Sequence, residues 1–344
     1  MAIHRKFCSA AFAIGVAVLT ASHVSFATES HELVVYSYDS FAAADGVGPA
    51  IIPLFEKKCR CHVRVLPSGD AAQVLNRVEI DAKRGKPIAD VIVGIDQQIW
   101  ERAREFTQEW GTWKPHGYPS ELVADTIVGD GFLPVDYGLF AFIQDRRAKF
   151  RTPHSLRDLM APEFKRNVIL EDPRTSTPGL AFLLYSLAVG GSEFWRDFAG
   201  QWLTFAPGWD SAYGIFLRGE APLVWSYVTS QAYHEENGDH EHRYQAVMFD
   251  EGQPIQVEGA AMVRGTVHRE WAQQFLEFLI SPEAQAFFPT KNWMVPALKS
   301  AALPASFEHL PRVLKIVHPP TSAPSVARAL REWELTVMSQ GVHW

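Results

Sequence analysis

The sequence predicts an α/β fold of two lobes, each a mostly parallel sheet flanked by helices, joined by two hinge crossings. Near the start of the chain, short apolar runs alternate with amphipathic helical segments, which is typical of a parallel sheet with helices on both faces. Two later apolar runs, 132–142 and 255–263, are suited to carry the chain into a second lobe and back. The length of 344 residues also exceeds the roughly 250 to 300 residues that one hydrophobic core usually supports.

The first lobe is expected to alternate strands and helices. Strands are predicted at 33–37, 63–66 and 89–96 from their β-branched and aromatic content, with helices at 49–58 and 71–83. Asp70 is placed to cap the second helix, whose apolar side is expected to contain Val74, Val78 and Ile80.

Polar and aromatic residues follow each of these strands. They are Tyr38-Asp39-Ser40, Ser68-Gly69-Asp70 and Asp96. Ligands of parallel sheets bind beyond the carboxyl ends of the strands, so these residues are candidate ligand contacts. Asp70 has two roles open to it, helix cap and ligand contact, and the two are compatible.

The domain boundaries follow from the two crossings. The first lobe is predicted to take residues 28–135, the second 136–249, and the first again 250–344 with the C-terminal helices. Other predicted elements are helices at 193–203, 269–280, 281–285 and 323–338, a strand at 223–227 and a returning run at 244–249. Two α/β lobes with two connections form a hinged clamp, an architecture suited to closing on a solute.

The segment D-P-R-T-S-T-P-G-L at 172–180 lies at the centre of the predicted site. It precedes an apolar helical run, with Pro178 suited to the first helical turn and Ser176 or Thr177 to the cap. The free amides and positive dipole end of a helix start can bind a phosphate or another anion. An ordinary well-capped helix explains the same pattern, and on this segment alone both interpretations stay open.

Composition and the N-terminus indicate an exported protein that does not bind nucleic acid. The net charge of −7 argues against nucleic acid as a partner and is compatible with a cationic ligand. Residues 1–27 have the basic start, apolar stretch and small-residue cleavage site of a signal peptide. A helical anchor is the alternative, but the apolar stretch is short for a membrane span.

Two cysteines remain in the expected mature chain, Cys59 and Cys61. An exported pair can oxidise, although a bridge between residues two apart is strained, so the pairing stays open. A metal site would need further ligands, and His62 is the one nearby in the sequence, so no metal site is predicted.

A set of motifs spans nearly the whole mature chain. They are V-Y-S-Y-D-S-F-A at 35–42, V-L-N-R at 74–77, P-V-D-Y-G at 134–138, D-P-R-T-S-T-P-G-L at 172–180, G-W-D-S-A-Y-G-I-F-L-R-G-E at 208–220 and N-W-M-V-P at 292–296. Together with the Cys-x-Cys of 59–61, these segments resemble the periplasmic thiamine-binding proteins of ABC transporters, within the type II solute-binding fold.

The resemblance implies a set of ligand-binding residues. The set is Tyr38, Asp70, Ala71, Ser176, Thr177, Trp209, Tyr227, Val228, Thr229, Ser230, Tyr233 and Trp293. Two positions depart from the family pattern, since Ala71 replaces a glycine and Val228 replaces a threonine. A backbone amide at position 71 would tolerate alanine, whereas a requirement for positive φ would not.

The chemistry of thiamine agrees with these residue types. Its thiazolium ring is cationic, and aromatic faces such as Tyr38, Tyr233, Trp209 and Trp293 attract a ring cation. Asp70 could accept from the aminopyrimidine or balance the positive charge. Ser176, Thr177 and the helix start behind them would hold the hydroxyethyl arm or its phosphates. The ligand is therefore expected to be thiamine, thiamine phosphate or thiamine diphosphate.

The resemblance also implies a monomeric, periplasmic carrier that needs no cofactor and is not an enzyme, delivering its ligand to an ABC permease and its ATPase. Three other functions occur on the same fold. A thiamine-degrading transferase would need a cysteine in the cleft, and none follows Cys61. A ferric-iron-binding protein would need adjacent phenolates, and Tyr227 and Tyr233 are separated. A polyamine-binding protein would need more acidic residues at the strand ends.

Overall fold

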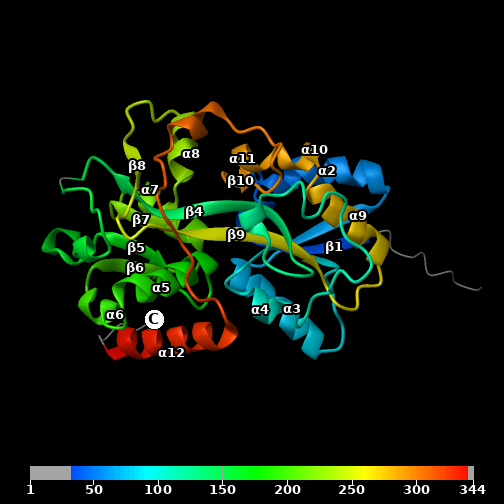
Figure 1. Ribbon diagram of the computed structural model, residues 1–344, viewed down its shortest axis with the longest axis horizontal. Helices are drawn as coiled ribbons and strands as arrows, with labels where there is room; N and C mark the ends of the chain where they lie inside the picture. The colour runs from blue at the N-terminus through cyan, green and yellow to red at the C-terminus, as the bar shows by residue number, and fades with distance from the viewer. Residues whose placement is uncertain (1–31, 149, 340–344) are drawn as a thin grey trace, which may run out of the picture. The chain divides into compact units, whose positions relative to one another are not determined.

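Two long strands, β4 (Leu133–Asp145) and β9 (Gln253–Met262), run side by side through the middle of the molecule (Figure 1). The computed structural model describes residues 32–148 and 150–339, so the predicted signal peptide lies outside the described residues. Helices and shorter strands gather at both ends of this pair and form two halves. The predicted α/β architecture, with two strands that cross between halves, is confirmed.

The strands form one mixed sheet in the order β2-β1-β3-β9-β4-β7-β5-β6. The shorter members are β1 (Glu32–Ser37), β2 (His62–Pro67), β3 (Val91–Asp96), β5 (Val168–Glu171), β6 (Trp202–Ala206) and β7 (Leu223–Tyr227). The outer strands of each half pair in parallel, as predicted. β4 and β9 pair antiparallel with each other and with their neighbours, which makes the sheet continuous through both halves.

The first half contains the two predicted helices, α2 (Val47–Cys59) and α3 (Ala71–Lys83), and two short helices that were not predicted, α1 (Asp39–Ala42) and α4 (Trp100–Ala103). Asp70 caps α3 in a capping box with Gln73, which satisfies amides at the helix start. Val74 and Val78 are buried as expected, but Ile80 is 48% exposed. The buried face of α3 instead includes Leu75 and Asp81.

The second half contains α5 (Thr177–Gly190), α6 (Phe194–Asp197), α7 (Trp209–Leu217) and α8 (Ser230–Glu236). The helix predicted at 193–203 is wrong beyond its first turn, because α6 ends at Asp197. Gly200 has φ +79, and the chain then enters β6, which pairs with β5. Strand pairing decides the conformation of Trp202 over the helical pattern of the sequence. The run 244–249 also differs from the prediction, because β8 (Tyr244–Val247) pairs with the distal part of β4 in the second half.

The C-terminal third returns to the first half and then leaves it again (Figure 1). Its elements are α9 (Arg269–Leu279), α10 (Pro282–Gln285), α11 (Phe288–Lys291), β10 (Val295–Pro296), β11 (Ile316–Val317) and α12 (Ala323–Ser339). α12 packs against α5 and α6, and Arg174 pairs with Glu334 at 3.2 Å. The last helix therefore belongs to the second half, unlike the prediction that grouped it with the first. The boundaries predicted at residues 135 and 249 stay predictions.

Short 3₁₀ helices complete the fold at Ala124–Thr126, Arg157–Met160, Pro162–Phe164 and Ala305–His309. Within the described ranges, no helix has both the length and the apolar character that crossing a bilayer requires.

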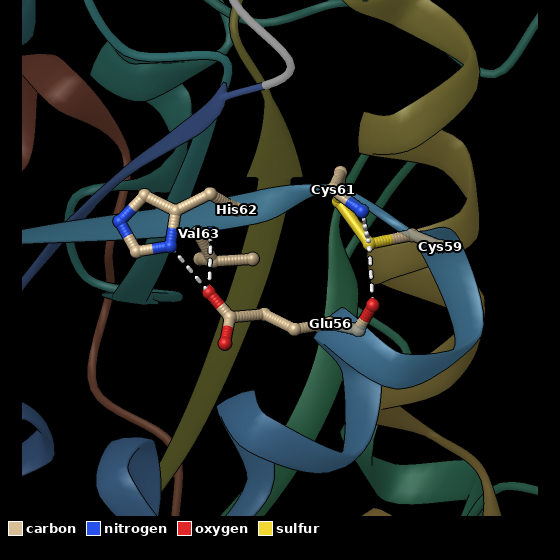
Figure 2. Close-up of a disulfide and its surroundings, with 5 residues drawn as sticks. All are labelled: Glu56, Cys59, Cys61, His62 and Val63. Carbon is tan, nitrogen blue, oxygen red and sulfur yellow. Dashed lines mark hydrogen bonds and ion pairs between the residues drawn. A yellow bond between two sulfur atoms is a disulfide. The ribbon is translucent and has the colours of Figure 1, made fainter.

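Cys59 and Cys61 are joined by a disulfide at the end of α2 (Figure 2). Arg60 between them has φ 54 and ψ 34, a left-handed conformation that ends the helix and turns the chain into β2. Glu56 supports the same turn, since its Oε1 accepts from the amide of Val63 at 2.8 Å. It also contacts His62 Nδ1 at 2.7 Å. The pairing that the sequence left open is thus present in the structure.

The double substitution Cys59→Ala/Cys61→Ala should lower the free energy of unfolding by roughly 1–2 kcal/mol, because the bridge closes a very short loop. Urea unfolding followed by tryptophan fluorescence measures this difference, and a reducing agent added to the wild type should reproduce it. No change in either experiment would mean that the two thiols are not joined in the native protein.

Candidate functional site

A cavity of about 520 Å³ opens between the two halves, within the usual size range for small-molecule sites. The first half contributes the loop after β1 and the start of α3. The second half contributes the starts of α5 and α7 and the face of α8. β9 and the segment after α11 line the remainder. The cavity therefore lies at strand ends and helix starts, as the sequence pattern predicted for ligand contacts.

Tyr38 forms one aromatic wall of this cavity, and its position depends on a glycine. Gly94 of β3 has φ +94, and a Cβ atom there would lie 2.0 Å from the Tyr38 ring. The strand register between β3 and β9 also shifts between Val93 and Ile95, a bulge that re-aims the neighbouring side chains. The Tyr38 ring lies against this bulge and is 9% exposed.

Trp209, at the start of α7, forms a second wall. Its Nε1 donates to Ser226 Oγ at 2.8 Å, and Ser226 in turn contacts Ser230 Oγ at 2.8 Å. The Tyr213 ring stacks on the indole with ring centroids 4.7 Å apart. The hydrogen bond fixes the edge of the indole and the stack fixes one of its faces, so Trp209 is held in place by its own half.

Tyr233 and Trp293 meet across the cavity from different halves. Their ring centroids are 5.4 Å apart with an interplanar angle of 77°. Trp293 has φ 55, a left-handed conformation that is uncommon for a tryptophan. Residues held in such conformations cluster at functional sites, where the surrounding structure fixes them. The contact between α8 and the segment after α11 therefore depends on this backbone turn.

Asp70 reaches from the first half to the helix starts of the second. Its Oδ2 accepts from the amide of Trp209 at 3.3 Å, and its Oδ1 accepts from the amide of Ala71 at 2.6 Å. Burial raises the pKa of the Asp70 carboxyl, while hydrogen bonds from these amides and from Ser176 oppose the rise. Asp70 thus serves as helix cap and as cavity wall together, the combination that the sequence left open.

Most residues of the predicted ligand set line the cavity. They are Tyr38, Asp70, Ala71, Thr177, Trp209, Tyr227, Ser230, Tyr233 and Trp293. Ala71 is the first residue of α3 and is not among the residues with positive φ, so its backbone fits the helix without glycine. The positive φ of this loop is at Gly69, which has φ +78. Ligand contact by these residues stays a prediction.

The other three predicted residues lie behind the cavity wall. Ser176 caps α5 and is fully buried, with its hydroxyl accepting from the amide of Gly179 at 3.4 Å. Val228 packs into the hydrophobic core of the second half. Thr229 precedes α8, and its buried Oγ1 has no hydrogen-bond partner. These residues position their neighbours along the wall in this structure.

Several polar residues of the cavity were not in the predicted set. Glu258 and Gln256 on β9, Asn292 after α11 and Asp210 in α7 line it. Gln256 and Glu258 carried a signal in the sequence, because two polar side chains interrupt the largely apolar run 255–263. Their position in a strand that crosses between halves, facing the cavity, follows from the tertiary structure.

The cavity lining is acidic. Among the described residues that form it, the carboxylates are Asp39, Asp45, Asp70, Asp210 and Glu258, and the basic side chain is that of Lys291. In the part of the chain that the structure describes, no three His, Cys, Asp or Glu side chains are grouped to hold a metal ion. Aromatic faces beside unbalanced carboxylates favour a flat, positively charged ligand.

A chain of hydrogen bonds connects the floor of the cavity. Tyr227 Oη donates to Gln256 Oε1 at 3.1 Å, and Gln256 Nε2 donates to Glu258 Oε1 at 2.9 Å. The Tyr38 hydroxyl lies 3.0 Å from Glu258 Oε2 and 3.2 Å from Asn292 Oδ1. The chain therefore spans both halves through β9, and a change in the interlobe angle would have to break or stretch it.

Comparisons with known proteins point to one family. The family model described as bacterial extracellular solute-binding protein matches residues 86–312. The thiamine-binding periplasmic protein of Salmonella typhimurium is 42% identical over 287 residues, which are 81% of this chain and 84% of that protein. A solved periplasmic thiamin binding protein superposes with a TM-score of 0.78 at 37% identity, covering 89% of this chain and 96% of that one.

A more distant likeness is limited to the fold. The ferric binding protein from Campylobacter jejuni superposes with a TM-score of 0.72 at 17% identity, covering 88% of this chain and 99% of that one. These structural matches confirm the predicted fold class of two lobes around a cleft.

Gly94→Ala should cost about 1–3 kcal/mol more stability than Gly85→Ala, because it also displaces Tyr38. Gly85 is a matched control, since it too has positive φ but its Cβ would meet nothing within 4 Å. Urea unfolding of both variants isolates the packing contribution from the backbone contribution. If both variants lose the same free energy of unfolding, the position of Tyr38 does not depend on the space above Gly94.

Proposed function

This chain belongs to the family of bacterial extracellular solute-binding proteins, and we propose that it captures thiamine in the cavity between its halves. The observation that supports the proposal most directly is the lining, where aromatic faces lie beside carboxylates. Thiamine combines a cationic thiazolium with a flat aminopyrimidine, so it matches both features. The proteins named as thiamine-binding at 35–42% identity support the same ligand.

The aromatic walls can supply much of the affinity. Each face that meets the thiazolium contributes roughly 0.5 to 2 kcal/mol, and stacking on the aminopyrimidine adds a comparable amount. Capture for transport needs a dissociation constant on the order of nanomolar, about 12 kcal/mol. Rings that are already fixed, as Trp209 is by Ser226 and Tyr38 is by Gly94, lose little entropy when the ligand binds.

The hydroxyethyl arm of the ligand would reach the start of α5. Thr177 lines the cavity there, and Ser176, which lies behind the cavity wall, caps the helix. A helix start offers free amides to a hydroxyl or a phosphate. Thiamine phosphate and thiamine diphosphate are therefore proposed as further ligands.

The proposed role is that of a periplasmic carrier. We infer that residues 1–27 direct export, that the mature chain works as a monomer, and that it delivers its ligand to an ABC permease and its ATPase. The support is the family itself, together with relatives that are named as periplasmic binding proteins.

A polyamine is a second candidate ligand, and the acidic lining favours it more than the sequence suggested. Flexible diammonium chains would leave the aromatic walls with little to stack on, so thiamine fits more of the cavity. Iron capture is disfavoured by the site, because Tyr227 is hydrogen-bonded to Gln256. Cys59 and Cys61 are bridged and are not part of the lining, so neither supplies the nucleophile of a transferase.

Calorimetric titration tests the proposal on mature protein that has been stripped of bound ligand by denaturation and refolding. Thiamine should bind with a submicromolar dissociation constant. Trp293→Ala and Tyr233→Ala should each weaken binding about tenfold or more, since each removes an aromatic face. Trp113→Ala is the matched control, because Trp113 is a partly buried tryptophan outside the cavity lining, and it should leave the affinity unchanged.

Spermidine and ferric citrate belong in the same series. Absence of heat and of any tryptophan fluorescence change with thiamine and its diphosphate would refute the proposal. Tighter binding of spermidine than of thiamine would move the assignment to polyamines.

A further inference from the structure

Three carboxylates lie on adjacent strands, and one of them, Glu258, lines the floor of the cavity. In the strand register, Glu258 of β9 pairs with Asp96 of β3 on one side and with Asp136 of β4 on the other. Residues directly opposite each other in antiparallel strands share a face of the sheet and have neighbouring side chains. We call Asp96, Glu258 and Asp136 the acidic row.

Irregular pairing on both sides brings the row together. The β3 register shifts between Val93 and Ile95, and the β4 register shifts between Pro134 and Asp136. Each shift moves the following side chain of its strand relative to β9, which is how bulges re-aim residues next to binding sites. Without the two shifts, Asp96 and Asp136 would not both pair with Glu258.

The row is buried and has no cationic partner. Asp96 and Asp136 are 0% exposed and Glu258 is 8% exposed. Among the described residues, no lysine or arginine forms an ion pair with any of the three. Neutral groups donate to them instead. The Tyr38 hydroxyl and Gln256 Nε2 donate to Glu258, the amide of Gln98 donates to Asp96, and the side chain of Asn292 donates to Asp136. Asp136 Oδ1 has no hydrogen-bond partner at all.

Like charges this close in a buried site cannot all be ionised at neutral pH. Burial raises the pKa of Asp96 to about 7. Burial also raises the pKa of Glu258, and the nearby charge of Asp136 adds to the rise. The titratable groups that face the row from other elements are Tyr38, Tyr227 and Asp70, and Lys291 lies exposed at the cavity rim. None of these is a buried cation that could balance the row.

We propose that the acidic row is the counter-charge for the cationic ring of the ligand, and that capture expels a proton held by the row into solvent. This inference rests on the proposed function, since thiamine brings the permanent positive charge. Glu258 is the member that reaches the cavity, and the rings of Tyr38 and Tyr227 stand beside it. The row therefore selects for a charged ring over a neutral ring of the same shape.

The direction of the pH dependence follows from competition. At low pH the ligand-free row holds a proton on one of its carboxylates. That proton must leave before the carboxylate can stabilise the cationic ring. As pH rises, that proton is already absent, so affinity for thiamine increases until the row is fully ionised. The dissociation constant should fall by up to about tenfold per pH unit while one proton is exchanged.

Calorimetry of thiamine binding to the wild-type protein between about pH 6 and 8 measures this exchange. Repeating the titration in buffers of different ionisation enthalpy gives the number of protons released, which should approach one. This measurement needs no substitution, so it does not depend on whether a variant folds.

Glu258→Gln removes the charge of the central member while it keeps the size of the side chain. Thiamine binding at the upper end of the pH range should weaken on the order of 10- to 100-fold, and proton release should drop. The neutral aminopyrimidine half of thiamine, which lacks the thiazolium ring, should bind wild type and variant equally. Asp81→Asn is the matched control, since Asp81 is a buried acid that accepts from Tyr36 at 2.7 Å outside the cavity lining.

The outcomes separate this inference from the proposed function. Tight thiamine binding with no proton release and no pH dependence would overturn the acidic row as counter-charge and leave the function intact. Unchanged affinity of Glu258→Gln would do the same. Loss of binding to the neutral half as well would show that Glu258 shapes the cavity instead of selecting charge. If the wild type does not bind thiamine, both proposals fall together.

Discussion

The antiparallel pairing of β4 with β9 is the constraint on which the rest of the structure depends. It runs from Leu133 opposite Ala260 to Leu139 opposite Ile255, and each strand then continues into the other half. The two halves are therefore built on one ladder of backbone hydrogen bonds, so the cavity between them has a continuous floor. The position of every group on that floor follows from this register, because a slip of one residue would turn each side chain to the opposite face.

This floor is costly to build. A buried carboxylate without a cation destabilises a fold, and the structure tolerates several of them beside the cavity. The surrounding core offsets the cost, since Phe140 stacks on Trp225 and on Tyr227 within the same sheet. Functional sites commonly destabilise the ligand-free protein in this way, because the ligand later supplies the partner of the buried group. The cavity thus has rings that are fixed by their neighbours and buried carboxylates that have no cationic partner among the described residues.

The sequence was most informative where one local signal decided the outcome. Asp70 followed by an amphipathic run predicted α3 with its cap, and the motif at 172–180 predicted a capped helix start at the cavity. It was less informative where pairing partners decided the conformation. Trp202 has a helical pattern around it but joins β6, and the last helix packs on the second half because its apolar face meets α5 and α6. Neither partner is visible from local spacing.

The sequence by itself determined the fold class, and it predicted most of the aromatic residues that line the cavity. Periodicity and motif content depend on neighbours in sequence, so they can be read without a structure. Only the tertiary structure decided which carboxylates meet. Asp96, Asp136 and Glu258 lie far apart in the chain, and they come together because β3, β9 and β4 are adjacent with two register shifts. Strand register is a property of the whole sheet, and no single segment specifies it.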